Sequence, residues 1–252
     1  IALVQGNIEQ YQKWSPAMRL KTIEIYTELS KQAIEQGDEA PALLVWPETA
    51  LPFLISDNPY FNNLKKQLIT KEKIWLLSGA PFYKKTDIKK SQQTIREVLS
   101  YNSAYLLTPE GEIGGRYDKQ HLVPFGEYIP LSNYLPLPGP LVENIGNFSA
   151  GKPVSPLSCQ SAEIGVLICF ESIFPKLARD WTSGGANLLV NITNDAWFGR
   201  SNAPLQLLSM AVFRALENRR SRARSANTCV SAVIDPLGKI SGATPLFQPA
   251  FL

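Results

Sequence analysis

The chain has 252 residues, of which 44% are hydrophobic and 19% are charged, and its formal net charge is +3. This length suits one large domain or two small ones, and the hydrophobic fraction argues against wholesale disorder. The one histidine, His121, excludes any site built on two or three histidines. The three cysteines are too few and too scattered for a CxxC metal site or a disulfide framework, and the sequence leaves open whether Cys159 and Cys229 pair.

The charge pattern and the ends of the chain bear on partners and location. Basic residues are spread along the sequence, which does not favour nucleic acid as a partner, and the one dense patch, at 219–224, is expected on a solvated or ion-paired helix face. No stretch approaches the roughly 20 apolar residues of a membrane span, and there is no signal peptide. Both ends look cut, since the chain starts without methionine and stops in an apolar run. We therefore expect a piece of a longer protein.

In the first part of the chain, short apolar runs alternate with longer amphipathic segments. The runs at 1–4, 42–45 and 74–77 predict strands. Between them, Ser15 followed by Pro16 predicts the start of a helix that stops near Gly37, and Asn58 with Pro59 opens another helix that reaches about residue 70.

The second part continues this alternation. Residues 98–107 and 112–116 flank a turn and predict a hairpin, whereas 124–153 form a long loop rich in proline, glycine and aromatic residues. Strands are expected at 163–168, 187–190 and 229–234, and helices at 174–181 and 204–224. Because there is no repeat and no convincing linker, the sequence predicts a single α/β domain over residues 1–252.

Three polar residues lie where predicted strands end, which is where α/β folds expose their working groups. Glu48 follows a strand that Trp46 and Pro47 stop, Lys119 follows the hairpin, and Cys169 follows the strand at 163–168. Each has a structural alternative. Glu48 suits a surface loop, Lys119 suits an ion pair with Glu127 that pins the loop, and cysteine is often a small core residue.

Together the three side chains make an acyl-transfer site that needs no histidine. A partly desolvated glutamate gains basicity and can take the thiol proton. A lysine cation favours a thiolate and then stabilises the oxyanion of the tetrahedral intermediate. The thiolate supplies the covalent step.

Longer motifs around these residues carry a resemblance to a known family. Glu48, Lys119 and Cys169 in this order resemble the Glu-Lys-Cys triad of the nitrilase (carbon–nitrogen hydrolase) superfamily. Within it, the chain is most similar to the bacterial apolipoprotein N-acyltransferase branch, from residue 1 to about 239. The similar segments are WPETALP (46–52), YDKQHLVPFGEYIP (117–130), FSAG (148–151), CFE (169–171), NITNDAWFG (191–199) and RALEN (214–218).

The resemblance implies an αββα sandwich and a ping-pong transferase that needs no cofactor and no metal. Cys169 would take an acyl chain from a phospholipid such as phosphatidylethanolamine as a thioester. The amino group of a diacylglyceryl-modified N-terminal cysteine on a lipoprotein would then accept it. Glu48 would be the general base, Lys119 the oxyanion stabiliser and Glu127 a support for Lys119. Residues matching positions that line the family's substrate site are Phe170, Glu171 and Trp197.

The same resemblance implies a location. The reaction belongs to the periplasmic face of the bacterial inner membrane, and the family carries membrane spans before and after this segment, both absent from this chain. The apolar 124–150 loop suits a lid that meets lipid, or alternatively a flap that covers the core. Helix residues Gln206, Leu207 and Leu208 stand where the family usually has Gln-His-Leu, and Cys229 where it commonly has glycine.

Two other functions compete with the acyltransferase. A soluble nitrilase-type amidase would use the same triad with water as the final acceptor, and it would release ammonia from simple amides. A non-catalytic scaffold would keep the fold alone, and the intact triad argues against it.

Overall fold

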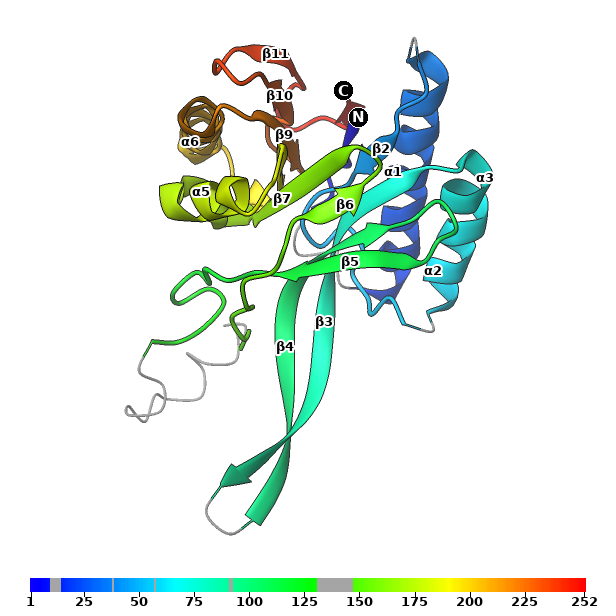
Figure 1. Ribbon diagram of the computed structural model, residues 1–252. Coiled ribbons are helices and arrows are strands. Elements are labelled where there is room, and N and C mark those ends of the chain that lie inside the picture. The colour runs from blue at the N-terminus through cyan, green and yellow to red at the C-terminus, as the bar shows by residue number, and fades with distance from the viewer. Residues whose placement is uncertain (10–14, 38, 57, 91–92, 131–146) are drawn as a thin grey trace.

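The computed structural model describes residues 1–9, 15–37, 39–56, 58–90, 93–130 and 147–252. Two β-sheets lie face to face and helices cover the outer face of each, so the layers run helix, sheet, sheet, helix (Figure 1). The αββα sandwich implied by the sequence resemblance is therefore confirmed.

The first sheet comes mainly from the N-terminal half of the chain. Its strand order is β12-β1-β2-β3-β4-β5. The strands are β1 (Ala2–Gln5), β2 (Leu43–Val45), β3 (Trp75–Lys90), β4 (Gln93–Leu107), β5 (Ile113–Asp118) and β12 (Ala250–Phe251). Its helices are α1 (Pro16–Gln36), α2 (Pro59–Leu64) and α3 (Thr70–Glu72), with a π-helical turn at Lys65–Ile69. Ser15 caps α1, as predicted, by accepting a hydrogen bond from the N–H of Met18.

The second sheet and its helices come from the C-terminal half. Its strand order is β11-β10-β9-β8-β7-β6. The strands are β6 (Leu157–Cys159), β7 (Ala162–Ile168), β8 (Leu188–Thr193), β9 (Ser221–Ala226), β10 (Ala232–Ile234) and β11 (Ile240–Ala243). The helices are α5 (Pro175–Ser183) and α6 (Ala203–Asn218), with 3₁₀ turns at Cys169–Ile173 and Asp195–Phe198.

The strand directions decide where polar side chains gather. In the first sheet β1, β2 and β3 are parallel, and β5 runs with them because β4 is antiparallel to both β3 and β5. In the second sheet β7, β8 and β9 are parallel. The turns that carry Glu48, Lys119 and Cys169 follow β2, β5 and β7 respectively. All three turns thus lie at carboxyl ends of strands, where α/β proteins place their sites.

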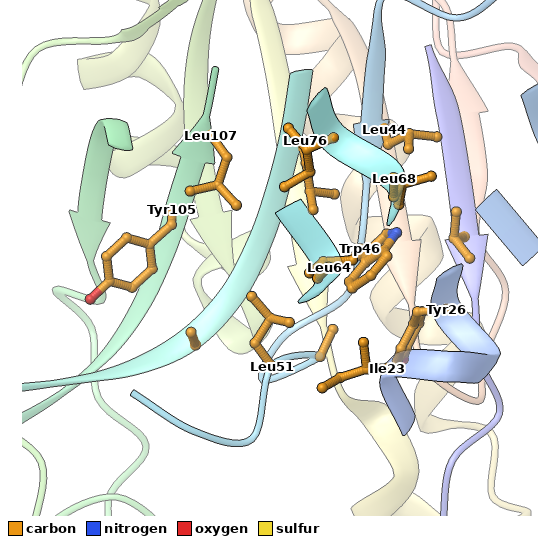
Figure 2. Packing of buried hydrophobic residues seen from close by; sticks show 14 of the residues in the cluster. Ile23, Tyr26, Leu44, Trp46, Leu51, Leu64, Leu68, Leu76, Tyr105 and Leu107 are labelled. Carbon is orange, nitrogen blue, oxygen red and sulfur yellow. The ribbon is translucent and has the colours of Figure 1, made fainter. Parts of the chain in front are cut away.

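Apolar layers hold the sandwich together. Between the first sheet and its helices, Trp46 stacks on Tyr26 with ring centroids 5.1 Å apart (Figure 2). The indole N–H of Trp46 donates to the Ser30 hydroxyl at 2.9 Å. In the second sheet, a Cβ at Gly165 would lie 2.7 Å from the Cβ of Trp181, so only glycine lets α5 approach β7 this closely. The first of these contacts anchors the residue two positions before Glu48.

Two predicted elements were wrong in extent. The strand expected at 74–77 is the start of the much longer β3, which pairs with β4 in a twisted hairpin that projects from the body of the molecule (Figure 1). The helix expected at 204–224 ends at Asn218, because Arg219 adopts a left-handed conformation with φ of 52° and closes it. Residues 221–226 then form β9, whose side chains are small or buried.

Because the helix ends at Asn218, the basic residues at 219–224 do not lie on it. Arg222 and Arg224 are fully buried in β9 rather than lying on a solvated helix face. Their charges are spaced two residues apart, which puts both on one face of the strand. The expectation of a solvated or ion-paired helix face was therefore wrong in its helix and in its exposure for both arginines, although Arg224 does form an ion pair, with Asp195.

Candidate active site

Cys169 follows directly on β7 and stands in a strained conformation. Its φ of 54° lies in the left-handed region that non-glycine residues rarely adopt, and its side chain is only partly exposed. The side-chain amide of Asn191, on the neighbouring strand β8, donates to the carbonyls of Leu167 at 2.9 Å and Cys169 at 3.4 Å. These contacts hold the turn that presents the thiol.

A buried polar network at β8 and β9 supports the Cys169 turn. Arg224 donates to the Asn191 side-chain oxygen at 2.6 Å and forms a short ion pair with Asp195. Asp195 accepts a hydrogen bond from the Thr193 hydroxyl at 2.5 Å. Since Arg224 and Asp195 are both fully buried, each satisfies the other's charge.

Glu48 is 7% exposed and its carboxylate is held from both sheets. One oxygen accepts a hydrogen bond from the side-chain amide of Asn102 on β4 at 2.7 Å. The other accepts from the backbone N–H of Asn194, which follows β8, at 2.8 Å. The surface-loop alternative does not describe this residue, because its side chain points into the space where the two sheets meet.

Lys119 is 1% exposed, and its ammonium lies between the two oxygens of Glu127, at 2.9 and 2.8 Å. Glu127 also accepts from Asn102 at 3.0 Å and from the backbone N–H of Val123 at 2.9 Å. Asn102 thus joins the Glu48 carboxylate to the Lys119–Glu127 pair. The structure brings Glu48, Lys119 and Glu127, the three charged residues predicted to take part in catalysis, into one hydrogen-bonded group.

The charges of this group act on one another and on the thiol. Burial raises the pKa of Glu48, although Lys119 lowers it. Burial acts to lower the pKa of Lys119, but the negative charges of Cys169, Glu48 and Glu127 together raise it. Burial and then the charge of Glu48 raise the pKa of Cys169, against the opposite effect of Lys119. These shifts favour a neutral thiol at Cys169 and a charged ammonium at Lys119, and they make Glu48 a stronger base than an exposed glutamate.

Glu171, expected in the substrate site, is fully buried, and both of its oxygens accept hydrogen bonds from the chain. One oxygen accepts from the hydroxyl of Tyr117 at 2.8 Å and from the backbone N–H groups of Gln120 at 2.7 Å and His121 at 3.0 Å. The other accepts from the N–H of Ile168 at 2.8 Å. In this structure Glu171 ties the segment after Lys119 to the turn that carries Cys169.

The other expected lining residues lie at the surface side of the turns. Phe170 is partly exposed and makes an edge contact with Phe174, at 5.6 Å between ring centroids, and Phe174 stacks on His121 at 4.5 Å. Trp197 is 67% exposed in the turn that follows β8. Their role in binding substrate stays a prediction.

The expected 124–150 lid is described only at its two ends. Residues 131–146 lie outside the described residues, so this part of the prediction cannot be placed. At the first end, Phe125 is 68% exposed with φ of 61°. At the other, the N–H of Phe148 donates to the carbonyl of Glu127 at 2.9 Å, which joins the two ends beside the site.

Several side chains of the site carried no role in the sequence interpretation. The side chain of Asn102 holds Glu48, that of Asn191 holds the Cys169 turn, and Arg224 and Asp195 support this turn, whereas Asn194 holds Glu48 through its backbone N–H. A signal existed for Asn102 and Asn191, since both interrupt apolar strand segments, where a buried amide needs partners. In the described part of the chain, no group of three or more histidine, cysteine, aspartate or glutamate side chains is arranged to hold a metal ion.

Comparison with known proteins places the chain in a family. The family model for carbon-nitrogen hydrolases matches residues 1–249, and the chain belongs to that family. Among solved structures, it is similar to Nit3 of Saccharomyces cerevisiae, a nitrilase-superfamily member, with TM-score 0.71 and 19% identity over 99% of this chain and 86% of the other. An amidase from Nesterenkonia sp. AN1 gives TM-score 0.64 and 21% identity over 99% and 87%.

Curated relatives are more similar in sequence. The chain is 48% identical over 253 residues to an apolipoprotein N-acyltransferase of Geobacter metallireducens, covering 100% of this chain and 46% of that protein. An apolipoprotein N-acyltransferase of Pseudomonas putida is 35% identical over 262 residues, covering 100% and 47%. The chain thus spans about half the length of these relatives. Within the residues that the structure describes, no helix is both long and apolar enough to cross a membrane.

Proposed function

We propose that this chain is the catalytic domain, over residues 1–252, of an apolipoprotein N-acyltransferase. The observation that carries the chemistry is the strained Cys169 turn, whose thiol is close enough to the hydrogen-bonded group of Glu48, Lys119 and Glu127 for the charges of Glu48 and Lys119 to act on it. The substrate class is supported by the curated relatives that bear this name, one of them 48% identical over the whole chain.

In the first half-reaction, the Cys169 sulfur attacks the ester carbonyl of a phospholipid as Glu48 takes the thiol proton. The Lys119 ammonium stabilises the oxyanion of the tetrahedral intermediate. As the carbon–oxygen bond breaks, the proton passes from Glu48 to the leaving glycerol oxygen. The products are a Cys169 thioester and a lysophospholipid.

In the second half-reaction, the amino group of the diacylglyceryl-modified cysteine of a lipoprotein attacks the thioester. A carbon–nitrogen bond forms, the carbon–sulfur bond breaks, and the proton lost by the amine returns to sulfur through Glu48. Glu127 supports both steps by fixing Lys119. Phe170 and Trp197 would contact the acyl chain or head group at the periplasmic face of the inner membrane, and Glu171 would shape that site from within.

Intact-protein mass spectrometry of the natural full-length protein mixed with phosphatidylethanolamine tests this function. We expect wild type to gain the mass of one acyl chain and Cys169→Ala to gain none. Cys159→Ala, which removes a buried cysteine on β6, is the matched control and should acylate like wild type. Absence of an adduct on wild type, or an equal adduct on Cys169→Ala, would contradict the acyltransferase mechanism. Ammonia released from simple amides instead would point to an amidase.

Glu48→Gln tests the base assignment. Because glutamine cannot accept the thiol proton, we expect acylation to slow by on the order of 100-fold or more, since a general base typically contributes 10²–10⁴-fold. The rate of thioester formation under single-turnover conditions measures this. Acylation of Glu48→Gln at the wild-type rate would show that another group is the base.

A further inference from the structure

Asn227 follows directly on β9, is fully buried, and lies where the two sheets meet at the site. Its side chain is bound on one side by the first half of the molecule. The side-chain oxygen accepts from the backbone N–H of Ile8 at 2.9 Å and from the Tyr26 hydroxyl of α1 at 3.1 Å. The side-chain amide of Asn227 donates to the Ile8 carbonyl at 2.8 Å, and its backbone carbonyl accepts from the N–H of Asn7 at 2.8 Å.

On the other side, Asn227 binds the segment that follows β8. Its backbone N–H donates to the carbonyl of Thr193 at 3.1 Å, and its side-chain amide donates to the side-chain oxygen of Asn194 at 2.9 Å. Together with the first four bonds, these use every donor and both side-chain acceptor positions of an asparagine. No other uncharged side chain of this size could make the same set of bonds.

The Asn194 bond connects this network to the site. The backbone N–H of Asn194 donates to one carboxylate oxygen of Glu48 at 2.8 Å, and Asn102 holds the other oxygen from the first sheet at 2.7 Å. Two donors, one from each sheet, therefore fix the plane of the carboxylate. The position of the second donor depends on Asn227, which clamps the Asn194 segment to Ile8.

We propose that Asn227 is a positioning residue for Glu48, acting through Asn194. The proposal rests on the proposed function of Glu48 as the base. Asn227 contacts no reacting atom. It holds the Asn194 N–H in line with the carboxylate, so that the base stays ionised and oriented toward the thiol.

The pH dependence of thiol reactivity can separate positioning from mere stability. The charged groups that face Glu48 are Lys119 and Glu127, with Cys169 as the titrating thiol, and Asn227 adds no charge to them. A hydrogen bond donated to the carboxylate favours its charged form, so loosening the Asn194 bond raises the pKa of Glu48 further. In a curve of Cys169 alkylation rate against pH, the acid limb is the low-pH part, where the rate rises as the base loses its proton. This acid limb then moves to higher pH.

The experiment measures iodoacetamide alkylation of Cys169, by peptide mass spectrometry, across a pH series in the natural full-length protein. The test variants are Asn227→Ala and Asn194→Ala, the latter removing only the side chain that Asn227 holds. The matched control is Tyr26→Phe, which removes a donor to Asn227 on the side away from Glu48. Thermal unfolding of each variant gives its stability, and Glu48→Gln shows whether the acid limb belongs to Glu48.

We expect both asparagine variants to shift the acid limb upward by about one pH unit, the size of a charge-assisted hydrogen bond of about 1.5 kcal/mol. Tyr26→Phe should lower stability with the limb unmoved. Should Asn227→Ala fail to fold, Asn194→Ala decides alone. An unmoved limb in the asparagine variants, or an equal shift in Tyr26→Phe, would overturn the positioning role.

The two proposals can fail separately. If wild type forms no thioester with phospholipid but the limb shifts as expected, the substrate is wrong and the positioning role stands. If Glu48→Gln keeps the wild-type limb, Glu48 is not the base and the positioning role falls with it.

Discussion

At the scale of single residues, Glu171 shows how one buried carboxyl group can join segments that are far apart in the sequence. Four donors converge on its two oxygens, and they come from the segment after Lys119, from β5 and from the end of β7. Burial raises the pKa of this carboxyl to about 7, although the backbone N–H groups of Ile168 and His121 lower it. The carboxylate is suited to this position because it is an acceptor only, whereas an amide would point a donor at another donor.

This raised pKa predicts a pH dependence of stability. Between about pH 4.5 and about pH 7 the folded protein keeps a proton that the unfolded chain releases, so the contribution of Glu171 to stability falls as pH rises through that window and is constant above it. Glu171→Gln has no such change. We therefore expect the unfolding free energy of wild type, minus that of the variant, to fall by on the order of 3 kcal/mol across the window.

Urea denaturation of both proteins at the two ends of the window measures this difference. Charges elsewhere titrate in both proteins and cancel in the subtraction. A difference that stays constant with pH would mean that Glu171 has the same proton occupancy in the folded and unfolded chain.

At the scale of elements, the turn after β2 shows how a neighbouring strand fixes the position of Glu48. The N–H of Gly79 on β3 donates to the carbonyl of Pro47, and its carbonyl accepts from Leu51, so β3 holds both ends of the turn that carries Glu48. A Cβ at Gly79 would lie 2.3 Å from the backbone nitrogen of Thr49 and 2.7 Å from the Cα of Glu48. Both are backbone atoms, so a side chain there must displace the turn.

Gly79→Ala is therefore expected to disturb the site more than the fold. Displacing the Glu48 backbone by even part of an ångström weakens its bonds to Asn102 and Asn194, and we expect acylation to slow by roughly 100-fold. Ser78→Ala is the matched control on the same strand, because the Ser78 hydroxyl is buried and finds no partner among the described residues. Single-turnover acylation of the two variants compares them, and equal rates would contradict this role of Gly79.

The same scale shows why one element was predicted wrongly. Residues 204–224 contain apolar side chains at helical spacing, and the basic residues after Asn218 suited an exposed helix face. The structure instead pairs 221–226 with β8 and β10, and buries Arg224 against Asp195. An arginine in a sequence does not by itself predict burial, and Arg224 is stabilised in its buried position because the fold brings Asp195 to it as an acidic partner.

At the scale of the whole molecule, Gln5 joins the two ends of the described chain. It is fully buried on β1, and its side-chain oxygen accepts from the hydroxyls of Thr244 at 2.6 Å and Ser231 at 2.9 Å. Its amide donates to the carbonyls of Pro245 at 2.7 Å and Gln248 at 3.0 Å. These bonds fasten the C-terminal segment of the second half to the first sheet.

Replacing Gln5 should therefore destabilise the molecule as a whole. Gln5→Ala leaves buried donors and acceptors without partners, and we expect unfolding free energy to fall by about 3 kcal/mol. The exposed Gln36 at the end of α1 gives the control, because Gln36→Ala should change stability by less than about 0.5 kcal/mol. Urea denaturation measures both, and similar small changes in the two variants would show that the Gln5 network contributes little.

The sequence by itself determined the α/β alternation, most strand and helix positions, and the residue types of the site. These are local properties: an apolar run that stops at Pro47, or at Cys169 shortly before Glu171 and Ser172, marks a strand end wherever the strand lies. Only the tertiary structure decided which groups hold these site residues in place. Asn194 is 146 residues from Glu48, and Tyr117 is 54 residues from Glu171. Such partners meet only when the two sheets pack face to face, because a hydrogen bond depends on distance and direction rather than on separation along the chain.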